Sequence, residues 1–107
     1  MVIDVRSRIG IPDEVLEEFC QRWKVTELAL FGSALREDFR EDSDIDLLVT
    51  WIPDHGWSLL DHVQMQDELK ELTGRGVDLV SKRGIERSSN WLRRRSILES
   101  AQIVYAG

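Results

Sequence analysis

Two aspartates separated by one residue are the feature of this sequence most able to do chemistry. Asp44 and Asp46 lie within the segment 44–51, whose apolar residues predict a strand, and turn residues follow it. Side chains at positions i and i+2 of a strand leave the same face, so these carboxylates start about 6.5 to 7 Å apart. Neighbouring carboxylates repel unless a cation lies between them, and hard oxygen ligands suit Mg²⁺ or Mn²⁺. We therefore predict a divalent metal site with Asp44 and Asp46 as ligands.

A third aspartate has similar surroundings. Asp78 lies between Val77 and Leu79 in another short apolar strand, so it can face the same cleft if the two strands are neighbours. Three carboxylates can hold two metal ions about 3.5 to 4 Å apart, one activating a hydroxyl and one bridging the phosphates of a nucleotide. Asp78 could also take the proton of that hydroxyl. The three acids together favour in-line phosphoryl transfer.

A glycine-serine pair stands where a phosphate could bind. Gly32 and Ser33 follow the apolar run 27–31 and precede a possible helical turn. Glycine adds no side-chain bulk, so backbone N–H groups and the serine hydroxyl could meet a phosphate at close range there. Taken alone, such a pair is more often a plain turn, and a lone Asp-x-Asp is more often solvated than catalytic. The combination with Asp78 is what favours a catalytic site.

The elements that must position these residues follow from hydrophobic spacing and from turn residues. The pattern predicts helices from Pro12 to near Lys24, over 59–72 and over 88–99, strands over 27–31, 44–51 and 77–80, and an apolar tail over 103–105. In the helix over 59–72, ended by Gly74, the apolar face should cover the sheet with Leu59, Leu60, Val63, Met65, Leu69 and Leu72. This order predicts an α+β fold, a short mixed β-sheet with helices packed on one face and the acids on the other.

Length and composition set further bounds. The 107 residues can form one core, so we expect residues 1–107 to be a single domain. A net charge of -6 argues against direct nucleic-acid binding, which is driven by basic surfaces. Cys20 is the only cysteine, which fits a reducing compartment, and no stretch of about twenty apolar residues could span a membrane. We expect a cytoplasmic protein.

Two segments carry a resemblance to a known family. Residues 30–36, Leu-Phe-Gly-Ser-Ala-Leu-Arg, and residues 43–49, Ser-Asp-Ile-Asp-Leu-Leu-Val, resemble the signature of minimal nucleotidyltransferases of the DNA polymerase beta superfamily. The resemblance covers nearly the whole chain, because residues 77–80 fall where such proteins carry their third acid. It implies that Gly32, Ser33 and Arg36 hold the triphosphate, that Asp44 and Asp46 bind Mg²⁺, and that Asp78 is the third active-site carboxylate.

Members of this length resemble the antitoxin half of a two-gene toxin-antitoxin module. The resemblance implies a partner that is an all-helical HEPN ribonuclease toxin, a hetero-oligomer with that toxin, and transfer of AMP from ATP to a toxin tyrosine. Size agrees with this expectation, because a small domain cannot easily enclose both a nucleotide and a large acceptor. A partner chain would then complete the site.

Two other functions stay open. The chain could be a non-catalytic antitoxin that neutralises its partner by complex formation, or the nucleotide-binding subunit of a transferase acting on a small molecule. The last third of the chain is locally basic, which suits either a solvated helix face or a surface that docks an acidic partner. The residues concerned are Lys82, Arg83, Arg87, Arg93, Arg94 and Arg95.

Overall fold

A four-stranded mixed sheet forms the centre of the molecule. The computed structural model describes residues 8–35, 39–40 and 43–107. The sheet has the order β3-β2-β1-β4, in which only the β2–β3 pair is parallel. In chain order the elements are α2 (Asp13–Arg22), β1 (Val25–Phe31), η1 (Gly32–Leu35), β2 (Ile45–Trp51), α3 (Leu59–Thr73), β3 (Val77–Ser81), α4 (Lys82–Glu86), α5 (Trp91–Ser100) and β4 (Gln102–Ala106). The predicted α+β class with a mixed sheet is confirmed.

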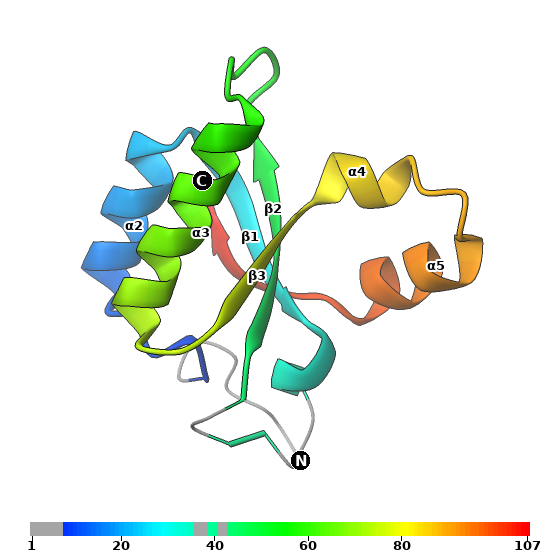
Figure 1. Ribbon diagram of the computed structural model, residues 1–107, viewed down its shortest axis with the longest axis horizontal. Helices are drawn as coiled ribbons and strands as arrows, with labels where there is room; N and C mark the ends of the chain where they lie inside the picture. Colours follow the sequence, from blue (N-terminus) through cyan, green and yellow to red (C-terminus); the bar gives the residue numbers. More distant parts are fainter. Residues whose placement is uncertain (1–7, 36–38, 41–42) are drawn as a thin grey trace.

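The main core lies between one face of the sheet and the helices α2 and α3, which lie together on that side of the sheet (Figure 1). Alternate residues of a strand face opposite sides, so Ile45, Leu47 and Val49 of β2 all enter this core and are almost fully buried. From the helices, Leu16 and Phe19 of α2 and Met65 and Leu69 of α3 meet them. The predicted helix-covered face is therefore present.

The opposite face carries a second, smaller apolar cluster. Leu48 of β2 and Phe31 of β1 are buried there against Ile85 of α4 and Ile97 of α5. Figure 1 shows α4 and α5 on the far side of the sheet from α2 and α3. The sequence pattern predicted helices on one face only, because α4 is short and α5 contributes a single buried side chain. The face that bears the acids is thus partly covered.

The ends of α3 follow their predicted chemistry, but its apolar face is narrower than predicted. Ser58 and Asp61 form a capping box at the N-terminus, and Gly74 ends the helix with φ 71°. Leu59, Leu60 and Val63 are 81%, 67% and 42% exposed, so the prediction that these three side chains cover the sheet is wrong. Leu60 and Val63 lie on the side of the helix away from the buried residues, and Leu59 lies in its first turn.

The predicted apolar tail is a strand. In β4, Val104 is buried in the main core, and the strand pairs with β1 at the edge of the sheet. The two paired strands lie more than 70 residues apart in the sequence, so the sequence pattern did not predict that they pair. None of the helices in the described part of the chain is both long and apolar enough to cross a membrane.

Candidate active site

The strand register brings two of the predicted acids side by side. In the parallel β2–β3 pair, Asp46 is the direct partner of Asp78. Strands in a sheet lie about 4.8 Å apart, and paired residues of parallel strands point to the same face. Asp46 is half-buried and Asp78 is exposed, on the face opposite the main core. Two carboxylates therefore share one patch of surface at the beginning of both strands.

The Gly32 turn lies directly against Asp46. Phe31 pairs with Asp46 across β1 and β2, so the next residue, Gly32, reaches the level of this carboxylate. Gly32 has φ +67°, and a Cβ at this position would collide with the Asp46 carboxylate, standing only 3.3 Å from its Cγ. Glycine is required here twice, once for the left-handed backbone and once for the close approach. The turn and the carboxylate form one continuous surface.

Asp44 takes a different position from the predicted one. The strand β2 begins at Ile45, so Asp44 lies one residue before it. The N–H of Ile45 donates to the carbonyl of Gly76 at 2.9 Å, which brings Asp44 beside this glycine. A Cβ at Gly76 would stand 2.9 Å from Asp44 Cγ. Asp46 therefore leans toward the turn after β1, whereas Asp44 leans toward the beginning of β3.

The donor chemistry of this patch fits a hard divalent cation. Asp46 and Asp78 offer only carboxylate oxygens, and two glycines leave the space beside Asp44 and Asp46 free of side chains. Within residues 8–35, 39–40 and 43–107 no three His, Cys, Asp or Glu side chains form a group that could hold a metal ion. This geometry still suits Mg²⁺, which is usually held by one or two carboxylates together with substrate phosphates. Metal ligation by the three aspartates stays a prediction.

Of the three residues predicted to bind the triphosphate, only Gly32 is described in full. Gly32 begins the short 3-10 helix η1, close to where a helical turn is expected. The hydroxyl of Ser33 and the whole of Arg36 lie outside the described residues. Their assignment to the triphosphate therefore remains a prediction.

Two residues that the sequence pattern did not single out position the segment before Asp44. The Arg75 guanidinium donates to the carbonyls of Arg40 at 3.0 Å and Ser43 at 3.4 Å. It also stacks over the Phe39 ring, with Cζ 4.7 Å from the centroid. Gly76 could have been found from its place directly before the strand of Asp78. Nothing in the sequence signals that Arg75 reaches across 35 residues.

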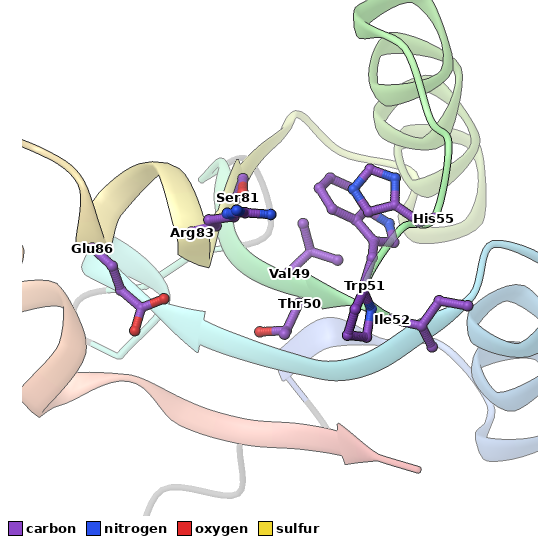
Figure 2. A pocket seen from close by; sticks show the side chains of 9 residues that line it. Val49, Thr50, Trp51, Ile52, His55, Ser81, Arg83 and Glu86 are labelled. Carbon is purple, nitrogen blue, oxygen red and sulfur yellow. The ribbon is translucent and has the colours of Figure 1, made fainter.

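A separate hollow lies at the other end of β2, at a distance along the strand from the acids. It measures about 240 Å³ and opens between the end of β2 and the beginning of α4. Figure 2 shows Ser81 and Arg83 on one side of it and Trp51 and His55 on the other. His55 Nδ1 accepts a hydrogen bond from the Trp57 backbone N–H at 2.8 Å. The hollow is not part of the carboxylate patch.

A mixed sheet, paired acids on neighbouring strands and a glycine turn against one of them define a class of protein, the nucleotidyltransferase domain. The model of that family, described as nucleotidyltransferase domain, matches residues 12–104. The chain belongs to this family, and its enzyme class is nucleotidyltransferase.

Among known proteins, the chain is similar to the protein adenylyltransferase MntA of Thermococcus cleftensis. The two are 39% identical over 72 residues, which cover 65% of this chain and 69% of that protein. The chain spans about two thirds of the length of the curated relatives it matches. A solved structure of a protein assigned as a minimal nucleotidyltransferase is 36% identical, with a TM-score of 0.65 over 94% of this chain and 95% of that one.

The fold also matches one half of a toxin-antitoxin complex. A tri-AMPylated Shewanella oneidensis HEPN toxin in complex with its MNT antitoxin gives a TM-score of 0.61 over 96% of this chain and 73% of the matched chain. The identity there is 15%, so this likeness concerns the fold alone.

Proposed function

We propose that this chain is an antitoxin that transfers AMP from ATP to a tyrosine of a HEPN-type ribonuclease toxin and so neutralises it. The observation that carries the proposal is the register that sets Asp46 beside Asp78, with the Gly32 turn against Asp46. It is supported by the similarity to a protein adenylyltransferase. The fold shared with an MNT antitoxin bound to an AMPylated HEPN toxin supports the choice of partner.

The reaction needs one bond made and one bond broken. The tyrosine oxygen of the partner attacks the α-phosphorus of ATP, a P–O bond forms, and the bond from that phosphorus to the bridging oxygen of the β-phosphate breaks. Pyrophosphate leaves with this electron pair, and the tyrosine proton passes to Asp78, whose exposed carboxylate lies beside Asp46. Carboxylates serve as such bases when they stand within hydrogen-bond reach of the proton. A cytoplasmic location is part of the proposal, because ATP is the substrate.

The remaining site residues have assigned parts in this proposal. Asp44, Asp46 and Asp78 would hold Mg²⁺, or Mn²⁺ in its place, and Gly32, Ser33 and Arg36 would hold the triphosphate. The cation supplies positive charge to the phosphates and to the developing negative charge of the transferred group. Gly32 contributes a turn without side-chain bulk, so a phosphate can approach its backbone beside Asp46.

Intact-mass spectrometry tests the proposal directly. The purified HEPN-type partner is incubated with this protein, ATP and Mg²⁺, and with the Asp44→Ala, Asp46→Ala double variant as the control. A gain of whole AMP units on the partner, located at a tyrosine by fragment masses and absent with the double variant, is the expected result. No mass gain on a partner that binds tightly would overturn transfer.

One observation favours a second candidate, which is neutralisation by binding alone. The chain is small and its charge is unevenly distributed, because residues 82–95 hold six of the 14 basic residues of a protein with net charge -6, which suits a partner-binding surface. A non-catalytic antitoxin would need only the partner interface. It would still block the ribonuclease after Asp44→Ala, Asp46→Ala, whereas a transferase would not, so a ribonuclease assay with the double variant separates the two functions. A subunit acting on a small molecule would leave the partner ribonuclease fully active in the same assay.

A further inference from the structure

The corner between α4 and α5 displays an unusual set of side chains. We define the α4–α5 corner by four exposed residues, Arg87, Trp91, Leu92 and Arg93. Trp91 and Leu92 are 56% and 63% exposed, although both are large and apolar. The guanidinium groups of Arg87 and Arg93 make no hydrogen bond or ion pair with any described residue. The corner therefore joins apolar surface to two uncompensated cations.

This corner is firmly built. The Asn90 side chain caps α5 by accepting from the Arg93 backbone N–H at 3.1 Å, and the Asn90 N–H donates to Ser88 Oγ at 3.2 Å. Arg94 Nη1 donates to the Ser88 carbonyl at 3.3 Å, which ties α5 to the end of α4. Ile97 anchors α5 to the sheet. A surface held in place before binding costs less conformational entropy when a partner docks.

The charge of the corner is opposite to that of the chain. Residues 82–95 hold six of the 14 basic residues and one of the 20 acidic residues of a protein with net charge -6. Arg93 also lies in the first turn of α5, where the helix dipole disfavours a cation. Helix stability therefore does not account for Arg93. Its position does suit a partner that brings negative charge.

The corner lies on the same side of the sheet as the candidate active site. Ile85 of α4 and Ile97 of α5 pack on Leu48, and Leu48 is two residues from Asp46 on the same strand face. Figure 1 shows α4 and α5 together on this side. A protein bound at the corner would lie on the side of the sheet that bears the carboxylate patch.

We propose that the α4–α5 corner docks an acidic segment of the protein that accepts AMP. Trp91 and Leu92 form the apolar centre of this contact, and Arg87 and Arg93 pair with carboxylates of the partner. Exposed tryptophan and arginine are the residues most enriched in the energetic centres of protein interfaces. A nucleic acid is charged along its whole backbone and would also meet the acidic remainder of the chain, whereas a protein can confine its carboxylates to the segment at the corner, which favours a protein. The inference rests on the proposed function, because it takes the acceptor to be a protein.

The test compares Arg93→Glu with a matched charge reversal elsewhere. Lys70→Glu changes the net charge equally, but Lys70 lies on α3, across the sheet from the corner. Calorimetry measures the Kd for the purified HEPN-type partner, and the Tm of each variant is recorded in parallel. Arg93→Glu should weaken binding about tenfold while its Tm stays equal or rises, because an acid suits the first turn of a helix. Leu92→Ser should weaken binding without changing its salt dependence.

The outcomes distinguish this inference from the proposed function. If both corner variants bind the partner as Lys70→Glu does, the corner is not the docking surface, whatever the wild type transfers. If Arg93→Glu weakens binding but intact mass shows no AMP on the partner even with wild type, the docking role of the corner is supported and the proposal of AMP transfer is overturned. A wild type that does not bind the partner overturns both. If the corner variants lose binding to single-stranded RNA while their Kd for the partner is unchanged, the corner binds RNA and the inference is overturned.

Discussion

Single residues decide the chemistry of the carboxylate patch, and Asp46 has the most constrained position among them. It pairs with Asp78 on one side and lies against Gly32 on the other. Two carboxylates side by side on neighbouring strands offer the hard oxygen ligands that a divalent cation prefers. The shape of the Asp46 side chain fits the turn, and its charge suits a cation.

Asp46→Asn separates the charge of this side chain from its shape. The amide keeps the shape of the side chain but removes the charge, so AMP transfer should fall by at least about a hundredfold, as expected when a main electrostatic contribution to a transition state is lost. The Tm of the variant is recorded in parallel and should change little, because the amide has nearly the same size and shape as the carboxylate. Transfer at the wild-type rate would show that Asp46 is not a ligand or catalytic group.

Gly32→Ala should damage the site more than it damages the fold. A Cβ would strain the left-handed backbone and push the Asp46 carboxylate aside. Gly74→Ala is the matched control, because Gly74 also has positive φ but a Cβ there meets nothing within 4 Å. Both variants should lose about 1 to 2 kcal/mol in denaturant titrations. Only Gly32→Ala should lose transfer activity, and equal losses of activity in the two would contradict this role for the turn.

At the scale of elements, a clamp of charged side chains joins α2 to α3. Arg22 of α2 donates two hydrogen bonds to Glu68 of α3, at 2.7 and 2.8 Å, and two to Glu18 within its own helix, at 2.8 and 3.0 Å. The hydrogen bonds from Arg22 hold the pKa of Glu18 below its usual value. These side chains are partly exposed, so the clamp contributes modestly to stability.

The clamp predicts a specific pH dependence for Arg22→Gln. A carboxylate with a lowered pKa stabilises the folded state above the ordinary pKa of a glutamate, and this contribution disappears as the pH falls through the lower folded-state value. The variant should therefore have a slightly lower Tm than wild type at neutral pH and low salt, and the two should converge in acid and at high salt. A Tm difference that persists in acid would point to lost packing of the Arg22 stem instead.

The elements also show what sequence reasoning could and could not supply. Alternation of apolar residues around Asp46 and Asp78 predicted two buried strands. The spacing of Asp44 and Asp46 predicted both carboxylates on one face of a strand, but Asp44 lies before β2 and beside Gly76. The parallel register that makes Asp46 and Asp78 direct partners could not be read from either strand alone, because it depends on how α3 crosses between them. The contact of Arg75 with the Asp44 segment was equally hidden, since it joins positions far apart in the chain.

At the scale of the whole molecule, the edge strand β4 completes both the sheet and the main core. Val104 is 4% exposed and Ile103 is 56% exposed, although they are neighbours on one strand. Val104→Ser should cost about 2 kcal/mol of unfolding free energy, from lost apolar burial and a buried hydroxyl. Ile103→Ser, the matched control, should change stability little. Chemical denaturation of the two variants checks this, and equal losses would mean that β4 does not pack as described.

The position of β4 in the chain has a consequence for the time course of synthesis. Strands β1 and β2 can pair as soon as both have been made, but the outer edge of β1 stays unpaired until residues 102–106 exist. All four strands must therefore be translated before the sheet is complete. The domain therefore gains its complete fold only after β4 has been translated, and until then β1 presents an unpaired strand edge to other chains.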